Sequence, residues 1–466
     1  MVFSRLKSGC LLAPINLELT TSCNQANKEA HKQIDIMSGE KTIDGVGLEK
    51  IMKETFGYFL HETNLDNGLV KDKSAPDWPS SIAATGMALA IYPVVVEHGF
   101  ITRGAAMERV LTTLRFFWNS HQGPEPDATG YHGFYYHFLD MQTGRRVWQC
   151  ELSTVDSAIL LAGILTVGVY FDANVSGEQE IRNLADGLYK RADWQWAQNG
   201  GTTVTHGWNP ETGFLKYRWK GYDEALILYI LGLGSPTYPL PENSYSAWAS
   251  TYEWINSYGY EYLYAGPLFT HQISHIWIDF RGIQEAFMRI RGIDYFENSR
   301  RATYVQQRYA IDNPNGFLGY GQNCWGITAS DGPGPETIMT GGKKYQFFDY
   351  KGRGVPYGPD DGTISPWAVV ASLPFAPEIV LPAIYYLVND VNLKTSNLYG
   401  FRASFNLSYR HRKNFGWVSP WHYGLNQGPI ITMIENYKTG LLWNLMRNCP
   451  YIINGLRRAG FSGGWL

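Results

Sequence analysis

Two carboxylates, Glu151 and Asp156, stand directly in front of an apolar run in the segment "CELSTVDSAILLAGIL". Ser153 and Asp156 are spaced as a capping box, with Ser153 as the N-cap and Asp156 at the third helical position. A cap needs only one acid and is worth about 1 kcal/mol, so it explains Asp156 but leaves Glu151 without a structural task. Both acids would project at the mouth of the same helix, where either could take part in acid–base chemistry.

A third acid, Glu224, lies at the start of the apolar run in "WKGYDEALILYI", beside Trp219 and Tyr222. The alternative role is that of a first-turn acid that interacts with the helix dipole, worth about 0.3 to 1 kcal/mol, and Asp223 could serve that role equally well. Aromatic surroundings would raise the pKa of a carboxyl group, as the role of proton donor requires. Glu224 is therefore the candidate general acid.

These acids need helices to position them, and the chain supplies helical patterns from Gly45 onward. Stretches of about 15 to 20 residues with helical periodicity alternate with loops rich in Gly, Pro and aromatic residues, whereas strand signals are scarce. No change of composition separates the stretches, which favours one domain over residues 41–466. Paired helices with long loops at one end predict an all-α (α/α)6 toroid, in which six inner helices surround a central cavity and a few short hairpins lie at the rim. Helices are predicted over residues 47–63, 80–100, 102–121, 154–171, 178–197, 222–234, 274–290, 293–311, 365–373, 377–390 and 428–445.

Aromatic residues are unusually frequent, because 16 Trp, 31 Tyr and 22 Phe make up 15% of the chain while charged residues make up only 17%. This balance suits a large cleft lined with flat rings and hydrogen-bonding tips, as sugar-binding clefts often are, although aromatic residues more often belong to the core. The formal net charge is −3, so the chain lacks the basic excess expected for nucleic-acid binding. No apolar run approaches the roughly 20 residues that a membrane-spanning helix needs.

The first 40 residues read either as an export signal or as a disordered tail. Arg5 and Lys7 precede "CLLAPINLEL" and "TTSCN", a pattern similar to a bacterial export signal that ends in a lipidated Cys23. Pro14 and Glu18 interrupt the apolar segment, so a disordered tail is an equal alternative. We expect an extracytoplasmic protein, periplasmic or lipid-anchored, that is a monomer by default.

The spacing of cysteines and histidines predicts no metal site. The five cysteines are far apart and make no CxxC pair, which argues against zinc and against a disulfide-dense scaffold. His271 and His275 are four residues apart, a spacing that can bind zinc, but no Glu lies between them as in "HExxH". Asp360 and Asp361, in "DDG", suit a turn better than a calcium site. We therefore expect neither a metal nor a cofactor.

A series of strings follows one another along the chain: "GFYYHFLDMQTG", "ELSTVDSAILLAG", "RWKGYDEALILYILGLGSPTYPLP", "GPLFTHQISHIWIDFRGI", "CWGITASDGP", "DDGTISPWAVVASLPFAPE", "YGFRASFN" and "GPIITMIENYKTGLLW". Together they resemble the bacterial glucoamylase-like proteins that include glycoside hydrolase family 144. The resemblance runs from about residue 45 to the C-terminus, and it is specific because so many strings occur in order. Ser157 departs from the family pattern "STxDTA", a change expected to affect packing at the helix start and not the chemistry.

The resemblance implies an (α/α)6 barrel that acts on glucans, with endo-β-1,2-glucanase as the characterised activity and with inversion at the anomeric carbon. An inverting glycosidase needs a protonated carboxyl group as donor and an ionised one that activates water, roughly 6.5 to 9.5 Å apart. Glu224 fits the general acid, and Asp156 and Glu151 fit the general base or ligands of the sugar. The expected partner is a glucan oligo- or polysaccharide. Further residues expected to bind sugar or to line the cavity are His137, Asp140, Trp219, Tyr222, His271, Trp325, Asp331, Asp360, Asp361 and Glu435.

Two other functions stay open. Toroids of this type also host polysaccharide lyases, which use Tyr or His together with charge-neutralising Arg. The candidate loops are rich in acids and Trp and poor in Arg, which favours hydrolysis of a neutral sugar. A noncatalytic glycan-binding protein could retain the barrel and its aromatic platform, but the presence of Glu151, Asp156 and Glu224 argues against it.

Overall fold

The computed structural model describes residues 47–340, 342–391, 398–411 and 414–466. Glu49–Leu466 form one compact unit. The export signal or tail expected over residues 1–40 lies outside the described residues. In the described part of the chain, no helix combines the length and the apolar character needed to cross a membrane.

A ring of helices forms the centre of this unit. Its elements are α3 (Ile82–Glu97), α5 (Thr154–Tyr170), α8 (Leu226–Gly234), η2 (Leu268–His271), η3 (Ile273–Ile276), α12 (Pro366–Ala371) and α14 (Gly424–Lys438). α3 packs against α5 and α14, α5 against α8, η3 against α8 and α14, and α12 against α14. Gln272 joins the 3₁₀ segments to α12, because its Nε2 donates hydrogen bonds to Ala368 O and Ser372 Oγ. The contacts therefore close into a ring.

The sequence of the inner helices explains their central position. α3 and α5 are buried along nearly their whole lengths, so neither shows a polar face. A Cβ atom on Gly86 would come within 2.7 Å of Ile159 O, and one on Gly163 would clash with Gly86 O. Glycine is required at both positions because the two helix backbones touch. Ser81 and Ser153 cap α3 and α5, since each side-chain oxygen accepts a backbone N–H, and the cap at Ser153 was predicted.

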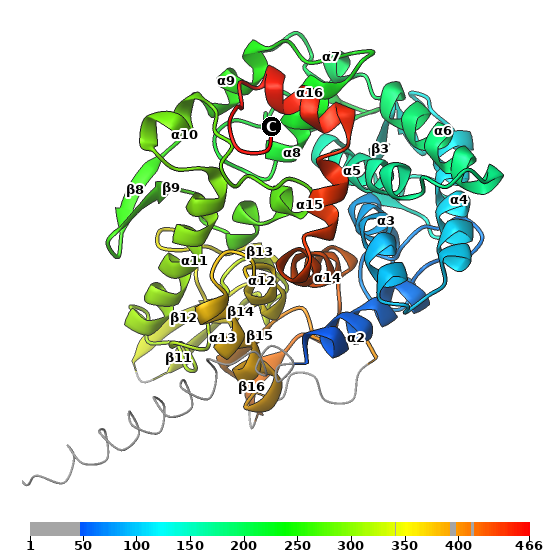
Figure 1. Ribbon diagram of the computed structural model, residues 1–466. Coiled ribbons are helices and arrows are strands. Elements are labelled where there is room, and N and C mark those ends of the chain that lie inside the picture. The colour runs from blue at the N-terminus through cyan, green and yellow to red at the C-terminus, as the bar shows by residue number, and fades with distance from the viewer. Residues whose placement is uncertain (1–46, 341, 392–397, 412–413) are drawn as a thin grey trace, which may run out of the picture. The chain divides into compact units, whose positions relative to one another are not determined.

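Outer helices alternate with the inner elements along the chain. They are α2 (Leu48–His61), α4 (Arg103–Asn119), α6 (Ser176–Arg191), α9 (Asn243–Ala249), α11 (Tyr295–Asp312) and α13 (Pro377–Asn389). Figure 1 shows α4 and α6 outside α3 and α5, on which they pack. α11 packs on η2, and α13 packs on α12. The remaining described helices are α7 (Trp194–Ala197), α10 (Ala286–Arg291), α15 (Leu441–Met446) and α16 (Pro450–Arg458).

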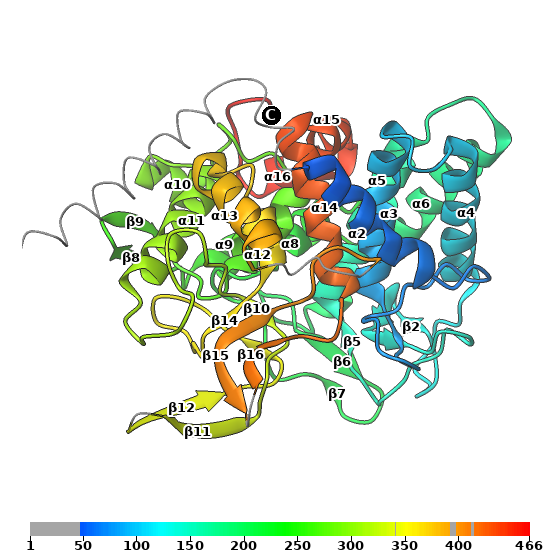
Figure 2. The ribbon, with the colours of Figure 1, turned by 90° about the horizontal axis from the view of Figure 1, so that it is seen from below.

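Small antiparallel sheets lie where several inner helices begin. One sheet has the strand order β2-β3-β5-β6-β7, with β5 directly before α5, and its register pairs Tyr136 with Leu152 and Tyr135 with Ser153. Figure 2 shows the labelled strands of this sheet on one side of the helices. The strands of this sheet are β2 (Gly130–Tyr131), β3 (Phe134–Tyr136), β5 (Leu152–Ser153), β6 (Gly207–Asn209) and β7 (Gly213–Phe214).

The other strands form hairpins and short pairs. β1 pairs with β4, β8 with β9, β10 with β13, β11 with β12, and β14-β15-β16 form a three-stranded sheet. β1 directly precedes α3, and β14 ends just before α12. Their bounds are β1 (Ser80–Ser81), β4 (Phe138–Leu139), β8 (Trp254–Ser257), β9 (Tyr260–Leu263), β10 (Ala329–Ser330), β11 (Glu336–Thr340), β12 (Lys343–Phe347), β13 (Lys351–Gly352), β14 (Thr363–Ile364), β15 (Phe405–His411) and β16 (Asn414–Val418).

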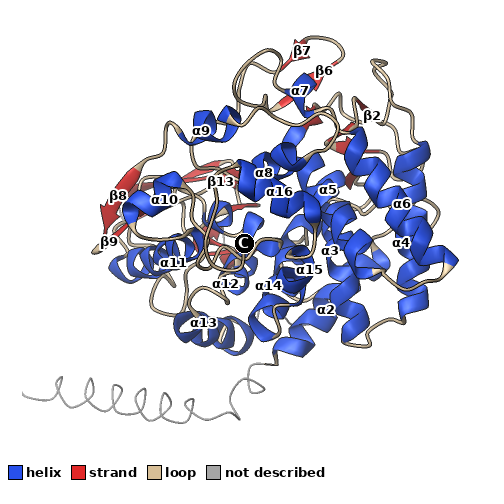
Figure 3. Ribbon diagram, turned by 45° about the horizontal axis from the view of Figure 1, so that its top comes forward, coloured by secondary structure: helices blue, strands red, loops and turns tan. Residues whose placement is uncertain are grey.

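The predicted all-α class is confirmed only in part. Helices predominate, as Figure 3 shows. The five-stranded sheet and the three-stranded sheet, however, go beyond the few hairpins predicted for the rim. The strands of the five-stranded sheet are two or three residues long, so they carry too little alternation of apolar and polar residues to be recognised in the sequence.

The helix predicted over residues 274–290 is wrong. η3 and α10 occupy only its two ends, and a loop lies between them. In that loop, Asp279 accepts hydrogen bonds from the backbone and the guanidinium group of Arg281. Glu285 then caps α10, because its carboxylate accepts the Met288 N–H at 3.1 Å.

Two other predicted helices are divided by residues that start a new helix. The stretch 178–197 becomes α6 and α7, because the Asp193 side chain caps α7 by accepting the Trp196 N–H at 2.9 Å. The stretch 428–445 becomes α14 and α15 at Gly440, whose φ of 70° is rare for other residues. α9 and α16 had no counterpart among the predicted helices.

Candidate active site

A cavity of about 320 Å³ opens where inner helices begin. It is lined by residues from the starts of α5, α12 and α14, from the loop before α8, and from η2 and η3. Glu151, Asp156, Glu224 and His137 are among them. The structure therefore brings the three acids singled out in the sequence into one cavity, from the mouths of two inner helices.

The N-terminus of α5 holds Asp156 in place. Ser153 Oγ accepts the Asp156 N–H at 3.3 Å, and the Ser153 hydroxyl donates to Asp156 Oδ2 at 2.5 Å. Ser153 is thus confirmed as the N-cap. The same side chain orients the carboxylate of Asp156 at the cavity wall, so the cap and a functional position are not exclusive.

A histidine joins the two acids at this helix mouth. His137 directly follows β3. Its backbone N–H donates to the backbone carbonyl of Glu151 at 3.0 Å, because β3 pairs with β5. His137 Nδ1 lies 2.9 Å from Glu151 Oε1, and His137 Nε2 lies 3.7 Å from Asp156 Oδ2. The interpretation of Glu151 as an acid without a structural task is therefore wrong, since Glu151 forms an ion pair with His137.

Opposite charges set the protonation of this pair. Burial alone would lower the pKa of His137, but the carboxylates of Asp156 and Glu151 raise that pKa to about 9. Burial alone would raise the pKa of Glu151, but the hydrogen bond and the charge of His137 hold it below its ordinary value. At neutral pH, His137 is an imidazolium and Glu151 is a carboxylate.

A further acid, Asp72, adjoins this group, and sequence reasoning missed it. Its carboxylate accepts the Trp78 Nε1–H at 3.1 Å. Burial raises the pKa of Asp72 to about 6, although the charge of His137 lowers it and that of Asp156 raises it further. Asp72 lies in the irregular segment before β1, where neither periodicity nor a capping pattern marks it. The one available signal was its place shortly before an inner helix.

The mouth of α8 holds Glu224 beside Asp223. Burial raises the pKa of Glu224 to about 7, and the charge of Asp156 adds to the shift. Asp223 accepts hydrogen bonds from Ala225 N and Trp248 Nε1, both at 3.0 Å. Burial and then the charge of Glu224 raise the pKa of Asp223 to about 8. Asp223 thus shapes the turn before α8, while Glu224 faces the cavity with a proton available near neutral pH.

Glu224 also separates two hollows. Glu224 and Phe269 line both the cavity of about 320 Å³ and a neighbouring hollow of about 530 Å³. Tyr222, Asp223 and Tyr264 line only the second of these two. Space on both sides of one acid suits a substrate that extends past it.

Aromatic side chains complete the lining of the cavity. Trp219 stacks on His206 with ring centroids 3.9 Å apart, and its Nε1 donates to Thr154 Oγ1 at 3.0 Å. Tyr350, in the turn between β12 and β13, also lines the cavity, and it is 55% exposed. Sequence reasoning missed Tyr350, because nothing in its loop distinguishes it from many other tyrosines.

Tyr222 and His271 lie together outside the lining of this cavity, with ring centroids 5.1 Å apart. Burial lowers the pKa of His271 to about 4 and that of His275 to about 3, so both are neutral. His275 Nε2 lies 3.0 Å from Ser299 Oγ. Among the residues that the structure describes, no three His, Cys, Asp or Glu side chains gather closely enough to hold a metal ion.

The structure does not place Trp325, Asp360 or Asp361 in the lining of the cavity. Trp325 is fully buried. Asp361 accepts a hydrogen bond from Arg353 Nε at 2.7 Å, and both side chains are 0% exposed, so a sugar cannot reach them. Asp360 accepts the Tyr320 hydroxyl at 2.7 Å. These carboxylates hold the loops before α12 in shape.

Glu435 and Asp331 also have other partners. Glu435, within α14, is buried, and its Oε2 lies 2.7 Å from His98 Nε2. Asp331 accepts the Ser419 hydroxyl at 2.7 Å. It is not among the residues that line the cavity. Sugar binding by Asp331 stays a prediction. Glu435 does not line the cavity, because it is buried against His98.

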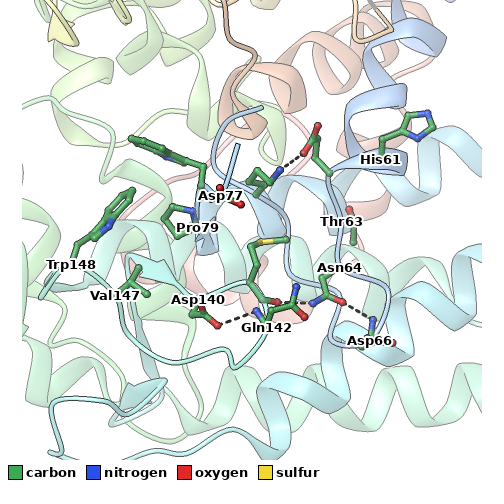
Figure 4. Close-up of a pocket in the computed structure, with 14 residues that line it drawn as sticks. His61, Thr63, Asn64, Asp66, Asp77, Pro79, Asp140, Gln142, Val147 and Trp148 are labelled. Atoms are coloured by element: carbon green, nitrogen blue, oxygen red, sulfur yellow. Dashed lines mark hydrogen bonds and ion pairs between the residues drawn. The ribbon is translucent and has the colours of Figure 1, made fainter. Parts of the chain in front are cut away.

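Asp140 lies in a separate groove beside the cavity. Its Oδ1 accepts the N–H groups of Thr143 at 2.7 Å and Gln142 at 3.1 Å, which holds the pKa of Asp140 below its ordinary value. The groove has a volume of about 700 Å³. Figure 4 shows Asp140 and Gln142 in its middle and Trp148 at one end.

Comparison with known proteins places this chain in a family. Residues 216–450 match the family model described as "Putative glucoamylase". The structure of a putative glucoamylase from Bacteroides uniformis superposes with a TM-score of 0.80 at 32% identity, covering 90% of this chain and 98% of that one. The chain therefore belongs to the putative glucoamylase family.

Two further relatives carry named activities. The chain is 28% identical over 446 residues to an exo-β-1,2-glucooligosaccharide sophorohydrolase (non-reducing end) of Parabacteroides distasonis, covering 88% of this chain. It spans only 57% of the length of that relative. The structure of an endo-β-1,2-glucanase from Chitinophaga pinensis, in complex with sophorotriose and glucose, superposes with a TM-score of 0.79 at 27% identity, covering 91% of this chain and 99% of that one.

Proposed function

We propose that this chain is an inverting glycoside hydrolase that cleaves a neutral β-glucan, with β-1,2-glucan as its substrate. The observation that carries the proposal is a shared cavity, in which Glu224, with its pKa raised to about 7, lies together with Asp156 and with the ionised Glu151 beside His137. A protonated acid and an ionised acid in one cavity are what hydrolysis of a glycosidic bond requires. The linkage is supported by the two relatives whose named activities concern β-1,2-linked glucans.

In the proposed reaction, Glu224 gives its proton to the glycosidic oxygen while the bond between C1 and that oxygen breaks. A water molecule attacks C1 from the opposite face and passes a proton to Asp156. The products are two shorter glucans, and the new hydroxyl group at C1 has inverted configuration. Glu224 then takes a proton from solvent and Asp156 releases one, which restores the starting state.

Asp156 is assigned as the base in preference to Glu151 for two reasons. Glu151 is already engaged by His137 at 2.9 Å, which holds its pKa below the ordinary value and makes it a weaker base. The charge of Asp156 contributes to the raised pKa of Glu224, so the two groups of the proposed pair sense each other. His137 is a positioning residue that keeps negative charge at the mouth of α5.

The lining of the cavity favours hydrolysis over elimination. Among the described residues that line it, no Arg or Lys is present, whereas Glu151, Asp156 and Glu224 are. A polysaccharide lyase would need a free cation to neutralise the carboxylate of an acidic sugar, whereas the imidazolium of His137 in this lining already faces Glu151 and Asp156. A cavity with this charge suits a neutral sugar.

We also propose that the outer and inner elements form an (α/α)6 toroid, which their alternation along the chain supports. Residues 41–466 would be the catalytic domain and 1–40 the export signal or tail. An extracytoplasmic protein, lipid-anchored at Cys23, would follow from the N-terminal pattern, and a monomer is the default. Metabolic lipid labelling of the wild type and Cys23→Ser tests the anchor.

The substrate is tested with a panel of linkage-defined glucans, with chromatography of product sizes and NMR of the first anomer released. We expect cleavage of β-1,2-glucan and initial release of the α-anomer, because inversion of a β-linkage gives α. Initial release of the β-anomer would contradict the inverting mechanism, and cleavage of another linkage alone would contradict the substrate.

The acid is tested with Glu224→Gln, for which we expect kcat to fall by about 10²- to 10⁴-fold while glucan binding is retained. Glu435→Gln is the matched control, because this buried glutamate contacts His98 and not the cavity. Turnover by Glu224→Gln equal to that of the wild type would remove Glu224 from the role of acid.

A further inference from the structure

The groove beside the catalytic cavity has the size and lining of a second ligand site. Its volume of about 700 Å³ falls in the range of roughly 300 to 1,000 Å³ that is usual for ligand pockets. Figure 4 shows Trp148 at one end of the groove and Asn64 and Asp66 at the other. Trp78 also lines it, so two indole rings meet a set of polar side chains.

The backbone holds Trp148 in an exposed position. Its side chain is 57% exposed, although tryptophan is usually largely covered. Trp148 and Gln149 both have a left-handed backbone, with φ values of 57° and 51°, which bulky residues rarely adopt. Asp77, which lines the same groove, has φ 53°. Strain of this kind gathers at ligand-binding sites, where the surrounding structure maintains it.

The two tryptophans form a corner. The ring centroids of Trp78 and Trp148 lie 4.9 Å apart at an interplanar angle of 70°, so the edge of one ring meets the face of the other. An exposed aromatic face of this kind offers an apolar surface on which the face of a sugar ring can stack. Lys73 Nζ lies 3.8 Å from the centroid of Trp78, a cation–π contact that helps to hold this ring in place.

This corner adjoins the catalytic group. His137 stacks on Phe138 with centroids 4.0 Å apart, and Phe138 lies 5.2 Å from Trp148. Trp78 Nε1 donates to Asp72, whose pKa is itself influenced by His137. An unbroken path of side chains therefore leads from the cavity to the groove, over a span short enough for one oligosaccharide.

The polar lining of the groove selects the kind of ligand. Glu62, Asp66, Asp77 and Asp140 contribute carboxylates, and Lys71 contributes a cation that Glu62 pairs at 2.8 Å. Carboxylates accept hydrogen bonds from hydroxyl groups and repel anions. The lining therefore fits a neutral ligand that is rich in hydroxyl groups.

We propose that the groove bounded by Trp78 and Trp148 binds distal glucosyl units of the same neutral glucan whose scissile bond lies at Glu224, an inference that rests on the proposed function. One glucosyl ring stacks on Trp148, and the carboxylates of Asp77 and Asp140 accept hydrogen bonds from its hydroxyl groups. The groove then adds affinity only for chains long enough to extend beyond the cavity.

The test measures the affinity of linkage-defined glucans of increasing length by calorimetry, in the Glu224→Gln background so that no chain is cleaved. We expect Trp148→Ala to weaken binding of long chains about tenfold relative to the shortest chain that binds. Trp148→Tyr should retain most of the affinity because it keeps an aromatic face. Trp118→Ala, on the outer helix α4 and 42% exposed, is the matched control and should bind all lengths like its parent.

Each other outcome is decisive. Equal affinities for Trp148→Ala and its parent at every length would overturn the distal site. An equal loss at every length would also overturn it, because the effect would then belong to the cavity or to the fold. Failure of the Glu224→Gln parent to bind any glucan, while circular dichroism shows it folded, would overturn the proposed function together with the distal site.

Discussion

The N-terminal ends, or mouths, of α5 and α8 look alike in the sequence, since each places acids in front of an apolar run. The acids at the two ends nevertheless differ in protonation. At α5, His137 lies between Glu151 and Asp156, and the pKa of Glu151 is held below its ordinary value. At α8, burial raises the pKa of Asp223 to about 8 and that of Glu224 to about 7. The protonation of a helix-mouth acid is therefore decided by what a distant segment brings to it and not by its own helix.

The largest expected effect removes the base at α5. Asp156→Asn should lower kcat by about 10²- to 10⁴-fold, because an amide cannot take a proton from water. Steady-state kinetics with the preferred glucan measures it. Asp360→Asn is the matched control, since Asp360 is held by Tyr320 outside the cavity lining. A kcat for Asp156→Asn within tenfold of the wild type would assign the base to another acid, with Asp72 the next candidate.

The second effect concerns stability and pH at α8. The pKa of Glu224 rises from 4.5 to about 7 on folding, so between these values the folded state binds more protons and the free energy of unfolding falls as pH rises. Glu224→Gln removes this loss. Relative to the wild type, it should gain about 3 kcal/mol between pH 4.5 and pH 8 in urea unfolding. A difference between the two proteins that stays constant over this range would contradict the raised pKa.

The third effect tests whether the imidazolium of His137 sets the charge at the start of α5. In His137→Gln the pKa of Glu151 should rise, because its ion pair is lost. Glu151 lines the cavity beside the base Asp156, so its protonation at a higher pH should shift the acid limb of the profile of kcat/KM to higher pH as well. At pH 5 we expect kcat/KM to fall about tenfold more than at pH 7. His121→Gln is the control, because His121 lies 2.9 Å from Glu125 in an exposed pair. An unchanged pH profile in His137→Gln would mean that the histidine does not set the charge of this group.

The same variant makes a prediction about stability. The pKa of His137 is raised to about 9, so its ion pairs stabilise the fold fully below pH 6.5 and lose that contribution as pH rises to 9. Thermal unfolding of the wild type should therefore show a decrease over this window that His137→Gln lacks. Glu224 and His137 thus give losses in different pH windows, the first between pH 4.5 and about 7 and the second between pH 6.5 and about 9.

The smallest effect compares two helix caps. Ser153→Ala and Thr102→Ala each remove a side chain that accepts a backbone N–H, so each should cost about 1 kcal/mol of stability. Only Ser153→Ala should also lower kcat, because the Ser153 hydroxyl donates to Asp156 Oδ2. Equal activity in the two variants would show that the cap does not position the carboxylate.

Local patterns predicted the features that depend on near neighbours in the chain. The cap at Ser153 and most helices follow from side chains within a few residues. The pairing of His137 with Glu151 depends instead on the register of β3 and β5, two strands too short to show alternation. Asp72 reaches the site through the packing of an irregular segment, which leaves no periodic signal.

Some residues expected to bind sugar do not line the cavity, for a similar reason. Asp361 and Glu435 are polar residues in strings that carry the family resemblance, and the sequence cannot show whether such a residue faces a cavity or a buried partner. In the structure, Asp361 pairs with Arg353, and Glu435 lies within hydrogen-bond distance of His98. Burial of a charge requires such a partner, so a polar residue in a well-matched string is as compatible with the core as with the site.

The difference between the two helix mouths is tested most directly by infrared difference spectroscopy of the carboxyl groups, titrated from pH 4 to pH 9 in the wild type and in Glu224→Gln. We expect a protonated carboxyl band that disappears near pH 7 in the wild type and is missing from Glu224→Gln, with Asp223 titrating near pH 8 in the wild type and at a lower pH in Glu224→Gln, which lacks the charge of Glu224. Titration of every carboxyl group below pH 5 in both proteins would contradict the assignment of Glu224 as the proton donor.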